Sequence, residues 1–531
     1  MPTDDGSSDH SPKIPLETSR PGASRLARTL RQPWFHVLTL ALGGRALWLS
    51  VQYLGGHPAV KRFHVESAAL AFVVVGLCLS VLTRRHRETT GGDTAAVPLW
   101  SLPAWWAAAV TLYWPALTLG YLSDDFVLVE RARNFQFGAF NPEAFRPVPL
   151  MVWAALLRFG GGAVAIHLVN VVVHGTNAFL ATRIARPFTS SHPTAALAGL
   201  LFLTMPIGPE AVAWNAGVFD VTATALVLAG ILIARGYSAY PSASRRCAFF
   251  ATGMIAFLCK ETALVAGLLV ALDGYVRDSR ARKLFFDAAV LTTIAFAVIG
   301  LRLTFGSSEA KETVTKYLVQ RWVFGTFGGL VVPWHINVIR SDAWLPMLDV
   351  AIVVALLSYF FVRSSSVARR RVVTAGAAWC LFGTLPAITL FFVAPDLQGA
   401  RYLYLPSVGY AAMLLAFGPL DAAGHRAARA IAVVAIGTLI VSGCVGVRWH
   451  LEPWRQASRV RDRVLNAAPL VSVDPNCKRP VFHQLPDTVD GAYVLRNGGD
   501  LALSAAVSTQ AAEPDGCSFR WNGNAFEREA R

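Results

Sequence analysis

The sequence predicts an all-α, polytopic membrane protein with about 13 transmembrane helices and a small β-rich domain at its C-terminal end. Composition is the first observation behind this prediction. Hydrophobic residues make up 54% of the 531 residues and charged residues only 15%, with a mean hydropathy of +0.45. Soluble domains carry about 25% charged residues. The second observation is that apolar stretches of about 18 residues, long enough to cross a bilayer, recur up to residue 447.

The predicted spans follow one another with short polar loops between them. Several are shorter than a full crossing, as expected of tilted or broken helices around a cavity. We assign the segment 321–340 as re-entrant or interfacial, because a full crossing would separate Arg369–Arg371 from the other basic loops. The predicted spans are 35–54, 65–83, 99–120, 163–182, 194–208, 219–236, 247–260, 261–276, 284–304, 346–363, 372–394, 402–418 and 429–447.

The basic residues predict the orientation. The net charge is +15, but Lys and Arg occur in short clusters between apolar segments. This is the orientation signal of membrane proteins and gives no reason to expect nucleic acid as a partner. The clusters, Arg84–Arg87 among them, fall in alternate loops, which we assign to the cytoplasm. The expected location is a bacterial inner membrane, with the N-terminus in the cytoplasm.

Four regions follow from this topology, and the last is a polar tail. After a helical stretch to about residue 466, it has Pro-Asn, Pro-Asp and Asn-Gly-Gly-Asp turn signals between short strand-like runs such as 492–495. The regions are a disordered cytoplasmic leader at 1–31, an additional N-terminal transmembrane hairpin at 32–97, a transmembrane core at 98–447 and an extracytoplasmic tail at 448–531.

Two of the seven cysteines, Cys477 and Cys517, lie in the tail. An oxidising compartment would allow them to form a disulfide, and two unpaired thiols are the alternative. The other cysteines lie in apolar segments, where cysteine packs as a small hydrophobe. No Cys or His spacing indicates a metal site. We therefore assign no metal ligand and no cofactor, and the need for a divalent cation stays open.

The same topology brings charged residues from different loops to the extracytoplasmic face. Polar residues without a common role would divide between the two faces, so this convergence predicts a functional site. The residues are Asp124, Asp125, Arg146, Glu210, Asp220, Lys260, Glu261 and Arg401.

Asp124 and Asp125 follow a long apolar segment and are the candidate catalytic residues. A carboxylate at such a site can act as the base for a hydroxyl, and cations can stabilise a leaving phosphate. Repulsion between neighbouring carboxylates raises a pKa, which suits a base. The alternatives are a hydrated pair that caps the next helix, and a metal-binding pair.

A second group of polar residues lines one face of a helix. His167, Asn170, His174 and Asn177 are separated by three, four and three residues, which places them on one side of a helix. Such a stripe faces the bundle or a wet cavity. We expect the first three to contribute to substrate binding, and interhelical hydrogen bonding without chemistry is the alternative.

Cations supply the predicted phosphate site. Arg401 stands beside Tyr402 and Tyr404, and its guanidinium can hold phosphate oxygens in a bidentate manner. The alternative is an arginine that extends to the lipid headgroups. Lys260 is a second phosphate candidate, unless it only neutralises its neighbour Glu261.

These motifs, in this order, resemble those of the bacterial and eukaryotic O-mannosyltransferase-like membrane proteins of the GT-C superfamily, especially the transmembrane branch that often carries tetratricopeptide repeats. The resemblance covers about 120–420. The motifs are Ser-Asp-Asp-Phe at 123–126, Phe-Arg-Pro-Val at 145–148, the His and Asn residues of 167–177, Pro-Glu-Ala-Val-Ala-Trp…Asp at 209–220, Lys-Glu-Thr-Ala at 260–263 and Arg-Tyr-Leu-Tyr-Leu-Pro-Ser at 401–407.

The resemblance implies a GT-C-like fold, a polyprenyl- or dolichyl-phosphate-linked sugar donor and an inverting transfer at the extracytoplasmic face. It also implies that Asp124 or Asp125 is the acceptor base, of which we favour Asp124, and that Arg401 clamps the phosphate. This sequence departs from the repeat-bearing members, because it has no repeats and adds the N-terminal hairpin and the cysteine-containing tail. Those departures leave the acceptor open.

We therefore predict a polyprenyl-phosphate-sugar-dependent glycosyltransferase of the membrane, with mannose as the sugar suggested by the resemblance. The expected partners are the lipid-linked donor, membrane lipid and a protein, lipid or polysaccharide acceptor. Two alternatives stay open: an enzyme of the same fold that modifies lipid or surface polysaccharide, and a non-catalytic transporter or assembly protein for lipid-linked sugars. A transporter would be expected to have inverted repeats and a polar site at the membrane midplane.

Overall fold

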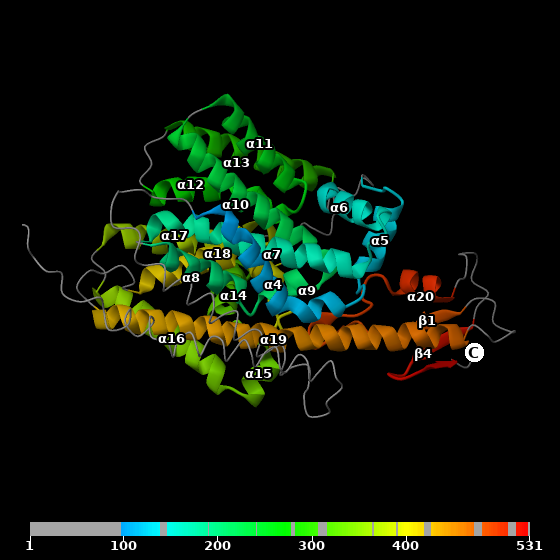
Figure 1. Cartoon of the computed structure of the whole chain (residues 1–531). Coiled ribbons are helices and arrows are strands. Elements are labelled where there is room, and N and C mark those ends of the chain that lie inside the picture. Colours follow the sequence, from blue (N-terminus) through cyan, green and yellow to red (C-terminus); the bar gives the residue numbers. More distant parts are fainter. Residues whose placement is uncertain are drawn as a thin grey trace, which may run out of the picture. The chain divides into compact units, whose positions relative to one another are not determined.

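The computed structural model describes residues 97–137, 146–189, 191–240, 242–277, 282–305, 316–363, 366–388, 391–418, 426–471, 480–507 and 517–528 (Figure 1). The predicted leader, both spans of the predicted N-terminal hairpin and Cys477 lie outside these residues.

The described part of the core is mostly helical, and a helix overlaps every predicted span from 99–120 onward. In chain order the elements are η1 (Leu99–Ser101), α4 (Leu102–Tyr113), η2 (Trp114–Thr118), α5 (Asp125–Arg133), α6 (Pro147–Arg158), α7 (Ala163–Ala185), η4 (Arg186–Phe188), α8 (His192–Leu203), α9 (Gly208–Ala213), η5 (Asn215–Gly217), α10 (Val218–Ala239), α11 (Ala243–Phe257), η6 (Glu261–Val265), α12 (Ala266–Val276), α13 (Arg282–Phe305), α14 (Lys316–Val331), α15 (Ile336–Ser341), α16 (Trp344–Arg363), α17 (Val367–Thr384), η8 (Leu385–Ala387), η9 (Ala400–Leu403), α18 (Pro406–Phe417) and α19 (Arg426–Val471).

Four helical segments of the described chain are long and apolar enough to cross a bilayer. Such lengths match a hydrocarbon core of about 30 Å. The protein is therefore a mostly helical membrane protein, whereas the number of crossings and their direction stay predictions. The four segments are Ala163–Phe188, Asn215–Ala239, Trp344–Val362 and Ala427–Leu470.

Helix α7 lies at the centre of the bundle, where it packs against α4, α8 and α10 (Figure 1). Small residues allow these close contacts. A Cβ added at Gly175 would lie 2.8 Å from the backbone oxygen of Trp105, and one added at Gly199 would lie 2.1 Å from Thr182 Oγ1. The packing brings the N-terminal ends of α7 and α10 next to the short helix α9, where the candidate site lies.

The segment predicted to be re-entrant consists of two helices with a break between them. Helix α14 has 16 residues and α15 has 6, and Pro333 lies in the break. At about 1.5 Å per residue, α14 is about 24 Å long, shorter than the hydrocarbon core. Trp334 and His335, at the end of the break, are buried in the protein. Whether this segment crosses the membrane stays open.

The C-terminal tail begins inside a helix. Helix α19 has 46 residues and continues through position 448, the predicted start of the tail, and through Pro453. Beyond it lie the short strands β1 (Val481–His483), β2 (Thr488–Val489), β3 (Ala492–Tyr493), β4 (Ser518–Trp521) and β5 (Phe526–Arg528), and helix α20 (Gly499–Val507).

The strands form two small sheets. Strand β1 pairs in parallel with β4, which pairs antiparallel with β5, while β2 and β3 form an antiparallel hairpin. The hairpin turn contains Asp490 and Gly491, both with positive φ (46° and 81°), as tight two-residue hairpin turns require. Cys517 is disulfide-bonded. Its pairing with Cys477 stays a prediction, since Cys477 lies outside the described residues.

Candidate functional site

The two adjacent aspartates lie at the start of α5 and face different surroundings. Asp125 is fully buried, and its carboxylate accepts hydrogen bonds from the backbone N–H groups of Leu122 (2.8 Å) and Ala216 (2.9 Å). Burial raises the pKa of Asp125 well above its usual value, and these hydrogen bonds oppose the rise. Asp124 is only half-buried. Asp125 therefore connects the segment before α5 to η5 through hydrogen bonds, and Asp124 stays accessible.

The backbone before Asp124 is strained. Ser123 has a φ of 51°, in the left-handed region that non-glycine residues rarely adopt. The hydrogen bond from its N–H to Val494 O (2.8 Å), in the tail, helps to hold it there. Backbone strain of this kind is maintained only where the surroundings fix it, and it clusters at functional sites.

Trp214, which follows α9, connects this loop to the predicted polar stripe. Its indole Nε1 donates to Leu122 O (3.2 Å). Asn170 Nδ2 in turn donates to Trp214 O (2.9 Å) and Asn215 O (3.2 Å). Asn170 therefore positions the segment that holds Asp125 in place.

The remaining predicted charges form three ion pairs. Arg146 makes a bidentate pair with Glu261, with N–O distances of 3.1 and 2.8 Å. Lys260 Nζ lies 2.5 Å from Asp220 Oδ1. Lys260 is thus paired with Asp220, and the alternative in which it neutralises only its neighbour Glu261 is wrong. The third pair joins Arg401 and Glu210.

Arg401 lies in an aromatic cage. Its guanidinium carbon is 4.8 Å from the ring centre of Trp214, 5.5 Å from that of Tyr402 and 5.7 Å from that of Tyr493. Its Nη1 lies 3.5 Å from Glu210 Oε1, and its backbone N–H donates to Glu210 Oε2 (2.9 Å). Arg401 is 20% exposed at its side chain. It is thus held by protein contacts and does not extend freely to headgroups.

Glu210 is the buried member of this pair. Burial raises the pKa of the Glu210 carboxyl, and the positive charge of Arg401 opposes that rise. The hydroxyl of Tyr493 also donates to Glu210 Oε1 (3.2 Å). Sequence reasoning missed Tyr493, because nothing in the strand-like run around it indicates a contact with α9.

The two residues of the polar stripe nearest the C-terminal end of α7, His174 and Asn177, belong to a buried hydrogen-bond network. His174 Nδ1 lies 2.7 Å from the hydroxyl of Tyr404, and its Nε2 lies 3.1 Å from Leu203 O. Asn177 Nδ2 donates to the same hydroxyl (3.1 Å) and to Val221 O (2.9 Å). These contacts connect α7 to the segments around it, as expected if the stripe serves interhelical hydrogen bonding.

His167, at the first turns of α7, is different. It is fully buried beside the backbone of Leu119 and Gly120. It lies next to the loop of Asp124, not in the Tyr404 network.

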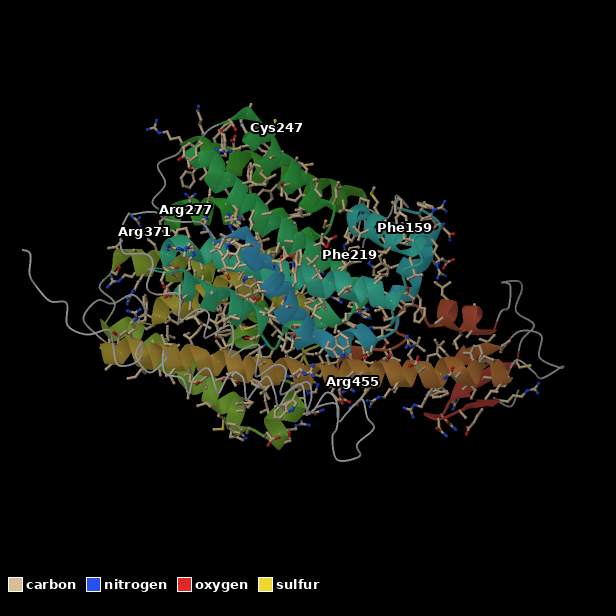
Figure 2. All side chains as sticks on the ribbon, viewed as in Figure 1. Phe159, Phe219, Cys247, Arg277, Arg371 and Arg455 are labelled. Carbon is tan, nitrogen blue, oxygen red and sulfur yellow. The ribbon has the colours of Figure 1, made fainter. Side chains whose placement is uncertain are left out.

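The ion pairs lie in one connected group. Lys260 Nζ is 5.9 Å from the ring centre of Tyr402 and within electrostatic reach of both Arg146 and Arg401. Arg146 lies over the ring of Phe219, 5.5 Å from its centre. Figure 2 shows Phe219 at a distance from Arg277 and Arg371, which belong to basic clusters assigned to the cytoplasm.

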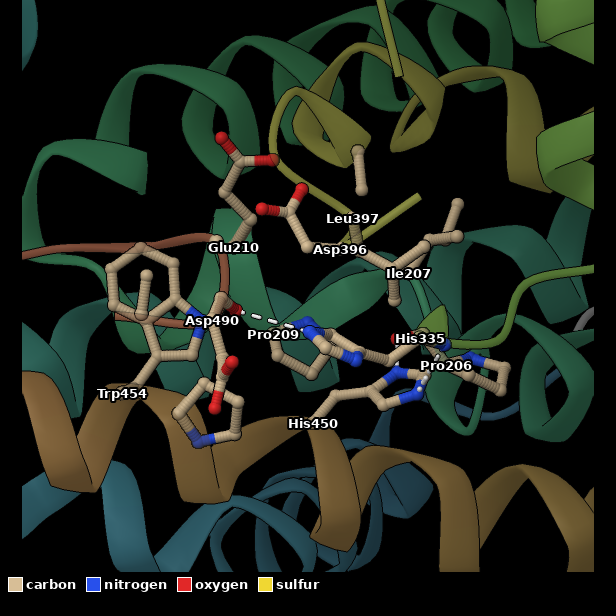
Figure 3. A pocket seen from close by; sticks show the side chains of 14 residues that line it. Pro206, Ile207, Pro209, Glu210, His335, Asp396, Leu397, His450, Trp454 and Asp490 are labelled. Atoms are coloured by element: carbon tan, nitrogen blue, oxygen red, sulfur yellow. Dashed lines mark hydrogen bonds between the residues drawn. The ribbon is translucent and has the colours of Figure 1, made fainter. Parts of the chain in front are cut away.

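A small cavity of about 20 Å³, room for a single water molecule, lies beside Glu210 (Figure 3). His335 and His450 line it together with Asp396 and Asp490. The backbone N–H of His335 donates to His450 Nε2 (3.1 Å), and His335 Nε2 lies 3.1 Å from Asp490 O. The break before α15, helix α19 and the β2–β3 turn therefore meet next to Glu210.

Nowhere in the described ranges do three or more His, Cys, Asp or Glu residues gather in a way that could hold a metal ion. Dependence on a divalent cation therefore stays open.

Comparison with known proteins finds similarity to glycosyltransferases. No family model matches the chain. Protein O-mannosyl-transferase TMTC4 of Homo sapiens is 25% identical over 410 residues, and its counterpart in Mus musculus is 22% identical over 405 residues. Each match covers 62% of this chain and 54% of the relative, so the chain spans about half the length of the relatives it matches.

Among solved structures, the cryo-EM structure of arabinosyltransferase EmbB from Mycobacterium smegmatis matches with a TM-score of 0.30 and 11% sequence identity. That match covers 74% of this chain and 45% of the other. The resemblance drawn from the motifs is confirmed by the sequence relatives: the chain is similar to proteins named protein O-mannosyl-transferase.

Proposed function

We propose that the protein transfers a sugar, mannose by analogy with its relatives, from a polyprenyl-phosphate-linked donor to an acceptor hydroxyl at the extracytoplasmic face of the membrane. The observation that supports this most is the grouping of three cations, contributed by Arg146, Lys260 and Arg401, near the loop of Asp124. A lipid phosphate needs such cations as it leaves, and an acceptor hydroxyl needs a base.

Asp124 is the proposed base. The acceptor oxygen attacks the anomeric carbon of the sugar from the side opposite to the phosphate. The bond between that carbon and the phosphate oxygen breaks, and its electron pair leaves with polyprenyl phosphate. The acceptor proton passes to the Asp124 carboxylate and then to water. Asp125 cannot take this role as readily, because its two oxygens are occupied by backbone N–H groups in a buried position.

Arg146 and Arg401 are the proposed phosphate contacts. Their side chains are 28% and 20% exposed, whereas that of Lys260 is 8% exposed. Arg401 Nη1 is buried, 3.5 Å from Glu210 Oε1, and makes no hydrogen bond within the described part of the chain, so the exposed remainder of the guanidinium is the part proposed to contact a phosphate oxygen. Lys260 adds positive potential between the two arginines without touching the ligand.

A different class of function is the alternative. Each of the three cations is already paired with a carboxylate, Glu261, Asp220 or Glu210. Cations whose charges are neutralised in this way would also suit a non-catalytic transporter or assembly protein that binds lipid-linked sugars. The acceptor, whether protein, lipid or polysaccharide, follows from neither reading.

The test is sugar transfer by the purified protein in lipid nanodiscs, with polyprenyl-phosphate mannose as donor. Asp124→Asn is compared with Glu130→Gln, an exposed carboxylate on α5, the helix that begins directly after Asp124. We expect Asp124→Asn to lose about 100-fold or more of the turnover rate, the size of a general-base contribution, and Glu130→Gln to match the wild type. Donor binding without turnover in every variant, the wild type included, would favour the transporter or assembly protein.

A further inference from the structure

A cleft of about 450 Å³ opens between the tail and α5. Val127 of α5 forms one side of it, and the rest of its lining comes from the tail between Phe482 and Leu501. The cations of the candidate site do not line it.

The cleft is attached rigidly to the loop of Asp124. The N–H of Ser123 donates to Val494 O (2.8 Å). Gly498, which lines the cleft, packs so closely that a Cβ on it would lie 2.4 Å from the backbone oxygen of Ser123. A ligand bound in the cleft would therefore keep a fixed position relative to Ser123, the residue before Asp124.

The side chains around the cleft suit a polyhydroxylated ligand. Asp487, Arg496, Asn497 and Asp500 line it, and all four are exposed. Planar carboxylate, amide and guanidinium groups can hydrogen-bond pairs of hydroxyls. Leu485 and Leu501 add apolar surface on which the C–H face of a sugar ring can pack.

Charge separates this cleft from the phosphate site. The two carboxylates, Asp487 and Asp500, outnumber the single Arg496, whose Nε lies 3.7 Å from Asp487 Oδ1. A phosphate would be disfavoured there, whereas an uncharged acceptor would not be. Arg496 also lies 5.9 Å from the ring centre of Tyr493, so the cleft adjoins the cage of Arg401.

We propose that this cleft binds a saccharide acceptor and presents one of its hydroxyls to Asp124. The proposal rests on the proposed glycosyl transfer and names its acceptor class. It assigns the donor phosphate to the arginines of the core and the acceptor to the cleft.

The test uses the full-length protein in nanodiscs and two separate measurements. Binding of linear trisaccharides of mannose, glucose and galactose, and of a Ser/Thr-rich peptide, is followed by calorimetry at millimolar ligand. Transfer to the same compounds is then measured with the mannose donor. The variants are Asn497→Ala and Asp500→Ala, and the control is Asn524→Ala, an exposed amide elsewhere in the tail.

We expect a trisaccharide to bind, and both cleft variants to weaken its binding and raise its KM about tenfold, as the loss of hydrogen bonds to sugar hydroxyls predicts. Donor affinity, the melting temperature of Asn497→Ala and every property of the control should stay unchanged.

Three results would overturn the proposal: no trisaccharide binds, a trisaccharide binds equally to the wild type and both cleft variants, or only the peptide binds and accepts sugar. If the cleft variants lose trisaccharide binding but the wild type transfers nothing, the saccharide site stands and the proposed glycosyl transfer fails.

Discussion

Tyr493, in the tail, donates a hydrogen bond of 3.2 Å to Glu210, the carboxylate that pairs with Arg401 from the membrane core. In the sequence, Tyr493 is 283 positions from Glu210, and Arg401 is 191 positions from Glu210. This contact makes the tail part of the candidate site, because the carboxylate that orients the proposed phosphate arginine is itself held by the tail.

The first prediction concerns this hydroxyl. Tyr493→Phe keeps the ring beside Arg401 and removes only the hydrogen bond to Glu210. We expect the free energy of unfolding to fall by about 1 kcal/mol and donor affinity to fall up to about tenfold, because Glu210 and Arg401 become less well ordered. Donor titration and denaturant unfolding measure both. Tyr240→Phe, on an exposed tyrosine, is the control, and an equal effect there would contradict the prediction.

The second prediction concerns the charge pair itself. Glu210→Ala leaves the largely buried Arg401 without its carboxylate, and breaking a buried pair in this way costs about 3–5 kcal/mol. The double variant Glu210→Ala with Arg401→Ala removes both charges. We expect it to be less destabilised than the sum of the two single variants, measured as the coupling energy of a double-mutant cycle. Additive losses would show that the two charges do not stabilise each other.

The third prediction concerns pH. Burial raises the pKa of Asp125 in the folded protein above that of the unfolded chain. The folded state therefore binds the proton more tightly, so the contribution of Asp125 to stability is fully present below the ordinary aspartate pKa of about 4 and is lost as pH rises through the raised value.

Asp125→Asn removes this titration. We expect the difference in melting temperature, wild type minus variant, to decrease as pH rises above about 4. Thermal unfolding of both proteins over a series of pH values measures it. A difference that stays constant or grows with pH would show that the pKa of Asp125 is not raised.

The fourth prediction compares two amides of the polar stripe on α7. Asn170→Ala leaves the buried carbonyls of Trp214 and Asn215 without this donor, and Asn177→Ala does the same to Val221 O. Each loss should cost about 1–3 kcal/mol of stability. Only Asn170 supports the segment that contacts Asp125, so we expect only Asn170→Ala to lower kcat. Equal kcat values for the two variants would place both amides in a purely structural role.

Local features of the sequence determined the class of this protein and the places of its helices. Hydropathy over about 18 residues and the periodicity of 3.6 residues per turn act between neighbours in the chain, so the helices at the predicted spans from 99–120 onward and the shared face of Asn170 and His174 were predicted. Helices α5 and α6 lie outside the predicted spans. The motifs also led to the family resemblance, because each is a short run of adjacent residues.

Only the tertiary structure decided how these residues pair and which of them are accessible. Lys260 is adjacent to Glu261 in the chain, yet it pairs with Asp220, and Glu261 pairs with Arg146. Asp124 and Asp125 look alike in the sequence, but packing against η5 buries only the second. Ion pairs and burial depend on which distant segments meet, and that is set by the packing of whole helices and of the tail, which no local pattern contains.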